Sequence, residues 1–177
     1  MKDNNEVEGL KTDDAHVFVS LADLKDTEFN RVWLQVANHS KAPIDFDPQS
    51  AMLVNEKDKV VRSEVAEKAA NSIQKYGEAK SQELSGAHCN YLGAVQCEPT
   101  DTQFRMSKQI LVDTASRAEW VRANAARRRT LAPGEETQGA IVFRKDKKPA
   151  KYLLRISVGS ETFEFPLSAQ NKHPSYD

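Results

Sequence analysis

The chain has 177 residues, which fits one domain of ordinary size with enough length to bury a hydrophobic core. Apolar residues make up 39% of the chain and charged residues 29%, and the mean hydropathy is -0.64, so the composition indicates a soluble protein with a charged surface. The 25 basic and 26 acidic residues give a net charge of -1, which supplies no overall field to recruit nucleic acid or an anionic membrane. No apolar run approaches the roughly 20 residues that a membrane-spanning helix needs.

The N-terminal residues 1–13 are polar and acidic and contain no apolar stretch that resembles a signal peptide. We expect a flexible tail there, a second tail at 169–177, and a single folded domain over 14–168. The N-terminal sequence is compatible with two cellular locations. The protein is either cytosolic with a disordered N-terminus, or exported with a signal that is absent from this chain.

Strand patterns are concentrated in two blocks, residues 14–62 and 131–167. In the first block, Val32, Leu34 and Val36 fall on one face of an extended chain while the residues between them fall on the other, which is the period of a half-buried strand. The same alternation recurs at Val17, Val19 and Leu21, at Ile44 and Phe46, and in the apparent hairpin that joins Met52 and Val54 to Val60 and Val61.

The second block begins at a turn of Pro133 and Gly134. Its apolar alternation then runs through Ile141 and Phe143, through Tyr152, Leu154, Ile156 and Val158, and, after Gly159 and Ser160, through Phe163, Phe165 and Leu167. About seven or eight short strands with frequent turns predict a mainly β protein, an antiparallel β-sandwich rather than a parallel α/β sheet.

The two β blocks share residues with a known class of domain. These are Val32 to Asn38 with Ser40, Pro43 and Pro48, then Leu131, Pro133, Gly134, Glu135, Gly139 and Phe143, then the Tyr152 to Phe165 hairpin. This pattern resembles small bacterial immunoglobulin-like domains of exported proteins and lipoproteins. The resemblance implies an immunoglobulin-like β-sandwich, a non-catalytic binding or assembly role, and a place in the periplasm or cell envelope, with a cytoplasmic address as the alternative. The class has no shared catalytic motif, so no functional residue is carried over.

A helical insertion, 63–130, separates the two blocks and makes the protein α+β overall. Ser63 is suited to cap a first helix and Gly77 is suited to end it. Between them, Val65, Ala69, Ile73 and Tyr76 form an apolar stripe at helical spacing. We expect this stripe to be a packing face rather than a ligand site.

A second helical region covers about residues 102–129, with a side that we expect to be buried, made by Ile110, Leu111, Ala115, Ala118, Val121 and Ala125. Ser116 and Glu119 have the spacing of a capping box, which would restart the helix midway. A length near 28 residues exceeds the usual range of roughly 8 to 20, so we expect two helices with a bend.

Both cysteines, Cys89 and Cys97, lie between the predicted helices. Eight positions apart in an irregular loop, they could close a disulfide in an exported protein, or stay reduced in a cytosolic one. Metal binding by these cysteines with His88 is disfavoured, because the spacing lacks a second paired half and His16, His39 and His173 are scattered in the sequence. We therefore expect no metal and no cofactor.

No catalytic residue is assigned. Cys89 and His88 supply a thiol and a base, but neighbouring residues seldom place the two groups face to face. Asp45 and Asp47 share one strand face, where a solvated edge is a better interpretation than a pair of catalytic carboxylates.

A basic cluster lies toward the end of the second helical region. Its candidate binding residues are Trp120, Arg122, Arg127, Arg128 and Arg129. Arginines in a last helical turn complement the helix dipole, and a solvated face is the ordinary outcome. The functional interpretation is a surface for an anionic partner, with Trp120 available for stacking. Three consecutive arginines cannot share one helix face, which disfavours nucleic acid.

The sequence thus predicts a non-catalytic binding or assembly module that recognises a protein or a polyanionic partner through its helical insertion. The alternative is an enzyme with a site between the insertion and the edge of the sandwich. A flat apolar patch on the insertion would favour a protein partner, whereas a deep pocket with perturbed titratable groups would favour the enzyme.

Overall fold

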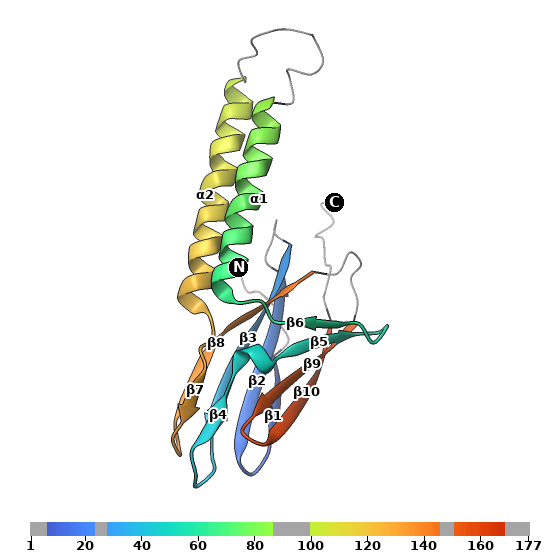
Figure 1. The fold of residues 1–177 in the computed structure, drawn as a ribbon, viewed down its shortest axis with the longest axis vertical. Helices are drawn as coiled ribbons and strands as arrows, with labels where there is room; N and C mark the ends of the chain where they lie inside the picture. The colour runs from blue at the N-terminus through green and yellow to red at the C-terminus, as the bar shows by residue number, and fades with distance from the viewer. Residues whose placement is uncertain (1–6, 24–27, 87–99, 146–150, 169–177) are drawn as a thin grey trace, which may run out of the picture. The chain divides into compact units, whose positions relative to one another are not determined.

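The computed structural model describes residues 7–23, 28–86, 100–145 and 151–168 (Figure 1). The chain divides into two compact units. The β unit contains the chain up to Val65 and again from Asn124, and the helical hairpin is Ala66–Ala123. The hairpin is shorter than the predicted insertion, 63–130, because the residues at both ends of that segment pair with strands of the β unit.

The β unit contains two antiparallel sheets. The four-stranded sheet has the order β1-β2-β3-β8. Its members are β1 (Val7–Lys11), β2 (Ala15–Asp23), β3 (Phe29–Asn38) and β8 (Glu136–Arg144). The register across the sheet places Val19 beside Leu34 and Leu34 beside Gly139.

The six-stranded sheet has the order β6-β5-β9-β4-β7, with β10 paired to β9. Its members are β4 (Ile44–Phe46), β5 (Met52–Asn55), β6 (Val60–Arg62), β7 (Arg129–Leu131), β9 (Lys151–Val158) and β10 (Glu161–Ser168). A short 3-10 helix, Pro48–Ser50, separates β4 from β5.

Both sheets contribute one face to a single hydrophobic core. Val32, Leu34 and Val36 of β3 are fully buried, as their alternation predicts. The largest fully buried side chains of the unit are Phe29, Phe46, Phe143, Phe165, Leu34, Leu53, Leu131, Leu154 and Ile156. The prediction of a mainly β, antiparallel protein with helices is confirmed, whereas the immunoglobulin-like class stays a prediction.

Strand β1 lies within the segment that we expected to be a flexible tail, 1–13. The expectation is wrong for Val7–Lys11, which pairs with β2 from Val7 beside Ser20 to Lys11 beside His16. The segment is polar and short, so its alternation is too weak to predict a strand. Pairing with β2 satisfies its backbone groups instead.

Asn38 ends β3 and is completely buried. Its Nδ2 donates to the carbonyl oxygens of Ala42 and Leu131, both at 2.9 Å. Its Oδ1 accepts from the backbone N–H of Ser40 at 2.9 Å and from the hydroxyl of the same residue at 2.8 Å. One side chain therefore connects the end of β3 to the following loop and to β7.

The helical hairpin consists of α1 (Ala66–Gly86) and α2 (Asp101–Asn124), which lie side by side (Figure 1). The prediction that Gly77 ends the first helix is wrong, because α1 continues for nine residues beyond it. The predicted bend at Ser116 is also absent, since α2 is continuous through that position. Finally, α2 ends at Asn124, before the arginine run.

Small residues form the contact between the two helices. The buried positions of α1 are Ala69, Ala70, Ile73, Gly77 and Ser81, and those of α2 are Ser107, Thr114, Ala118 and Val121. The hydroxyls of Ser81 and Ser107 hydrogen-bond across this contact. At Gly77, an added Cβ would lie 2.7 Å from the Cβ and 2.8 Å from the Cγ2 of Thr114, so glycine allows the close approach of the helices.

The segments of the β unit that flank the hairpin pair with β8. The backbone N–H of Glu64 donates to the carbonyl of Val142 at 2.9 Å, and that of Ala126 donates to the carbonyl of Ala140 at 2.9 Å. Gly139 is required beside this contact, because an added Cβ would lie 2.6 Å from the Cα of Ala126. The chain thus leaves and rejoins the β unit along one strand.

Candidate functional site

The structure divides the five predicted binding residues between the two units. Trp120 and Arg122 belong to α2, whereas Arg127, Arg128 and Arg129 lie in the β unit, in and just before β7. The arginine run is therefore not a helix end, and the dipole argument does not apply to it. The chain leaves the helix at Asn124 so that Ala125 and Ala126 can pair with β8.

Arg122 holds the two helices together. Its Nε donates to both carboxylate oxygens of Glu67, at 3.0 and 3.2 Å. Its Nη2 donates to Oδ1 of Asn71 at 2.9 Å and to Oε1 of Gln74 at 3.2 Å. A guanidinium that contacts three side chains of one neighbouring helix positions that helix. The Nε and Nη2 donors of Arg122 are thus occupied within the hairpin and are not offered to a ligand.

Replacing Arg122 by Ala is expected to lower the free energy of unfolding of the hairpin by about 1 kcal/mol, because a partly exposed ion pair and two hydrogen bonds are lost. Arg122→Lys should recover little of this loss, since a single ammonium cannot reach Glu67, Asn71 and Gln74 together. Urea unfolding followed by helical circular dichroism measures both. Lys80→Ala, which removes the exposed pair with Glu83, is the control and should cost less; equal losses would contradict the assigned role.

The three consecutive arginines have acidic residues close by. Nε of Arg128 lies 3.9 Å from a carboxylate oxygen of Asp47, and Nη2 of Arg129 lies 3.7 Å from one of Glu135. Asp45 accepts a 2.6 Å hydrogen bond from Thr130, and Asp47 caps the 3-10 helix through the N–H of Gln49, so the two aspartates serve separate structural roles. This segment is close to neutral rather than strongly basic.

Cys89, Cys97 and His88 lie outside the described residues, so the predicted alternatives for them stay open. Over the described ranges, no group of three or more His, Cys, Asp or Glu side chains is placed to hold a metal ion. The same ranges contain no helix that is both long and apolar enough to cross a membrane.

A polar groove with a volume of about 320 Å³ opens on the β unit. It is lined by Gln35 of β3, by Arg129 of β7, and by Glu136, Thr137 and Gln138 of β8. Nε2 of Gln35 donates to Oε2 of Glu136 at 3.0 Å, which orients both groups. Cross-strand pairing of β3 with β8 sets Gln35 directly beside Gln138. Every lining side chain can donate or accept hydrogen bonds.

An aromatic side chain lies in the same row of the four-stranded sheet. The register aligns Gly9, Phe18, Gln35 and Gln138 across β1, β2, β3 and β8. The Phe18 ring covers Gly9, where an added Cβ would lie 2.6 Å from its Cδ1, yet Phe18 is still 43% exposed. The outer face of this sheet therefore presents the Phe18 ring in one row with the groove amides of Gln35 and Gln138, and the groove also includes Arg129 of β7, a strand of the other sheet.

Two histidines that are distant in the sequence lie in contact in the β unit, with their rings tilted. The ring centroids of His16 and His39 are 3.8 Å apart, with the planes at 34°. The pKa of His16 is lowered, first by burial and then by the charges of His39 and Lys11. The neutral form of His16 is therefore favoured. This pair could not be predicted from the sequence, because the contact depends on the loop after β3, where the N–H of His39 donates to the carbonyl of Asp14.

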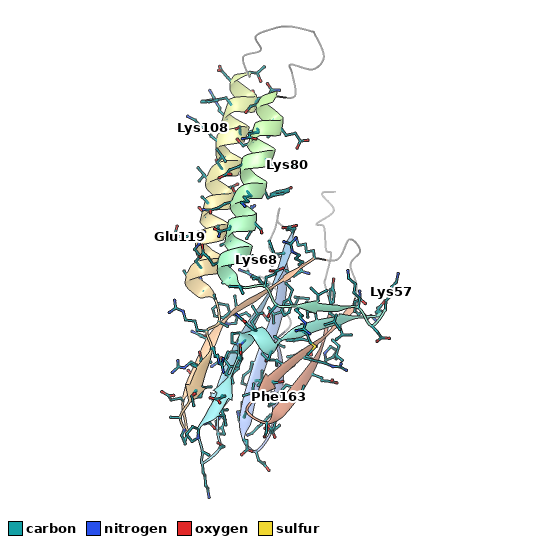
Figure 2. The ribbon with its side chains drawn as sticks, in the orientation of Figure 1. Lys57, Lys68, Lys80, Lys108, Glu119 and Phe163 are labelled. Carbon is teal, nitrogen blue, oxygen red and sulfur yellow. The ribbon has the colours of Figure 1, made fainter. Side chains whose placement is uncertain are left out.

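A stripe of exposed side chains follows one side of α2. We call it the α2 stripe: Phe104, Lys108, Leu111, Val112, Ala115 and Glu119. Phe104 is 50% exposed, Leu111 39% and Val112 60%. Nζ of Lys108 lies 4.4 Å from the centre of the Phe104 ring, which confirms that these two positions adjoin. The side chains of Lys108 and Glu119 project from the same side of α2 (Figure 2).

Comparison with known proteins finds no matching family model and no matching curated protein. Among solved structures, the chain is similar to the yjhA protein from Bacillus subtilis, with 11% sequence identity, a TM-score of 0.46, and coverage of 84% of this chain and 76% of that one. Neither value identifies a shared fold or function.

Sequence reasoning missed the groove, and it wrongly placed Leu111 and Ala115 of the α2 stripe on the buried side of the helix, whereas both are exposed. The only groove residue among the predicted site residues is Arg129. The apolar members of the stripe could have been recognised from their spacing, because Phe104 and Leu111 are seven residues apart and therefore share a helix face.

Proposed function

We propose that this protein is a non-catalytic assembly module that joins two copies of itself through the α2 stripe. The observation that carries the proposal is the stripe's exposed apolar surface, which a two-helix hairpin does not need for its own packing. The helices already bury a separate row of small residues against one another. The stripe is thus a second apolar surface on the same helix.

Charge complementarity supports a second copy of the chain as the partner. Lys108 and Glu119 lie at equal distances in sequence from the midpoint between Val112 and Ala115. If two stripes pack antiparallel about this midpoint, each Lys108 faces the Glu119 of the other copy, and Val112 faces Ala115. A two-fold symmetric contact of this kind is the commonest way in which identical chains associate.

The energetics favour a weak, reversible dimer. Each copy contributes three half-exposed apolar side chains, and burying the exposed part of each is worth about 1 kcal/mol. The total of about 6 kcal/mol is comparable with the loss of translational and rotational freedom on association, so the two charge pairs help to decide the outcome. The net charge of -1 adds little repulsion between copies.

A charge exchange tests the assembly. Sedimentation equilibrium of the full chain over a wide concentration range is expected to show a monomer–dimer equilibrium. Lys108→Glu and Glu119→Lys should each weaken the dimer about tenfold or more, because each places like charges opposite one another. The double variant should restore it. Leu111→Gln should weaken it through lost apolar contact.

Val60→Gln is the matched control, since Val60 is an exposed apolar residue of β6 in the β unit and its replacement should leave the dimer unchanged. A wild-type chain that is monomeric at every concentration would refute the proposal. So would a double charge variant that dimerises no better than the single variants.

The other predicted functions have less support. A polyanion surface would need unneutralised arginines, whereas Arg122, Arg128 and Arg129 each lie near a carboxylate. An enzyme that uses Cys89 and His88 stays a prediction, as does a place in the periplasm or cell envelope.

A further inference from the structure

The polar groove of the β unit contains groups suited to a hydroxylated ligand. The amide of Gln138 makes no hydrogen bond to the protein within the described part of the chain, and the amide of Gln35 uses one donor for Glu136. An amide offers two donors and an acceptor that accepts twice. A sugar hydroxyl is both donor and acceptor, so neighbouring amides can satisfy neighbouring hydroxyls.

The charge of the groove argues for a neutral ligand. Its cation, Arg129, has the Glu135 carboxylate 3.7 Å away, and its anion, Glu136, accepts from Gln35 at 3.0 Å. One positive and one negative lining residue give no net attraction for a charged polymer. Both groups can still form directional hydrogen bonds, which are stronger with ionised partners.

The aromatic ring gives the site a second kind of contact. Phe18 lies two strands from Gln138 in the same row, a distance of about 10 Å at the usual strand spacing. Gly9 leaves room for the Phe18 ring, because any side chain at that position would displace the ring. Trp33, two positions from Gln35 on β3, borders the same face. Apolar faces of pyranose rings pack on such aromatic side chains.

We propose that the outer face of the four-stranded sheet binds a neutral polysaccharide. One sugar residue packs on Phe18, and a following residue of the same chain hydrogen-bonds in the groove to Gln35, Gln138, Glu136 and Arg129. The polymer crosses the strands, because the ring and the groove lie in one row across β2, β3 and β8. This site lies in the β unit and does not depend on the α2 stripe.

A polypeptide ligand fits these observations less well. Extended peptides are usually bound by adding a strand to an open sheet edge, where backbone groups pair. The groove instead is lined by side chains of β3, β7 and β8, and the carbonyls of Ala140 and Val142 on the β8 edge already accept hydrogen bonds from Ala126 and Glu64. An acidic polymer is disfavoured by the balanced charge.

Affinity electrophoresis of the full chain tests the proposal with a soluble glucan, mannan and xylan as neutral polysaccharides, and with polygalacturonate and poly-glutamate as acidic ones. We expect at least one neutral polymer to retard the protein, with a retardation that high salt does not remove. The Gln35→Ala/Gln138→Ala variant should weaken that binding about tenfold, because two hydrogen-bonding amides are lost. Phe18→Ala should weaken it about fivefold.

Gln49→Ala/Gln82→Ala is the matched control, since it removes two exposed amides elsewhere and should leave binding unchanged. Phe18→Leu keeps an apolar cover over Gly9 but lacks the flat ring, so it separates a loss of stacking from a loss of fold, and thermal unfolding of each variant verifies folding. No retardation by any neutral polymer, retardation by the acidic polymers alone, or full binding by the double amide variant would each overturn the proposal. The Lys108→Glu variant, which should weaken the dimer, should bind the polysaccharide at each groove as tightly as the wild type does. Failure of the proposed dimer is therefore distinguishable from failure of the proposed polysaccharide site.

Discussion

Asn38→Ala is expected to lower the free energy of unfolding of the β unit by about 3 kcal/mol, one of the largest effects of any single substitution in this chain. The side chain is fully buried and makes four hydrogen bonds, to Ala42, to Leu131 and twice to Ser40. Its removal leaves the carbonyl of Leu131 without this donor in a buried position and leaves a cavity where the amide was. Urea unfolding followed by intrinsic fluorescence measures the loss.

Two further variants separate hydrogen bonding from volume at this position. Asn38→Asp keeps the shape of the side chain but replaces the Nδ2 donor by an acceptor that faces two carbonyl oxygens, so we expect it to be at least as harmful as Asn38→Ala. Gln49→Ala removes an exposed amide and should change stability by less than about 0.5 kcal/mol. If Asn38→Asp were as stable as the wild type, the hydrogen bonds would not be the cause.

Gly77→Leu should destabilise the helical hairpin by about 3 kcal/mol, although leucine forms helices far better than glycine does. The reason is the contact with Thr114, because a Cβ at position 77 would already lie 2.7 Å from the Cβ of that residue. The larger side chain must push α1 away from α2 or displace Thr114. Amide hydrogen exchange along α1 reports the stability of the hairpin itself.

Ala79→Leu is the control for this substitution, since Ala79 is exposed on the same helix and leucine there should be nearly neutral. Gly77→Ala/Thr114→Gly moves the glycine to the other helix and removes the side chain that the new methyl group meets, so it should recover part of the stability lost in Gly77→Ala, less the cost of a glycine within α2. Equal stability of Gly77→Leu and Ala79→Leu would show that the helices do not approach closely at this point.

Most strands of the β unit were predictable because the alternation of apolar and polar residues that indicates each strand lies within its own sequence. Val32, Leu34 and Val36 alternate with residues that face outward, and the sheet buries the three valine and leucine side chains as expected. The turn at Gly134 is also local, since its φ of 79° favours glycine. Strand β1 was not predictable in this way, because its pairing with β2, rather than its own apolar pattern, makes it a strand.

The errors in the hairpin have a common cause, which is that distant partners override local preference. Gly77 resembles a helix terminator when only its neighbours are considered, but its role depends on Thr114 of the other helix. Arg122 resembles a surface cation, but Glu67 on the opposite helix binds it. The sequence alone does not contain the register between α1 and α2.

The groove was beyond sequence reasoning for a similar reason. Gln35 and Gln138 are about a hundred positions apart and meet only through the pairing of β3 with β8. Arg129 was singled out for its two arginine neighbours, whereas in the structure it lines the groove with uncharged amides. The predicted reason for choosing Arg129, a basic cluster at a helix end, is therefore not supported by the structure.

The pairing of Glu64 and Ala126 with β8 has a consequence for aggregation. β8 is the last strand of the four-stranded sheet, and such a strand exposes backbone groups that can pair with another chain. The N–H groups of Glu64 and Ala126 already occupy the carbonyls of Val142 and Ala140 on that edge. A change in the length of the helices leaves this cover intact, whereas a deletion that reaches Glu64 or Ala126 exposes an apolar strand edge. Protection of the sheet edge therefore depends on the short segments around Glu64 and Ala126 and not on the helices that they flank.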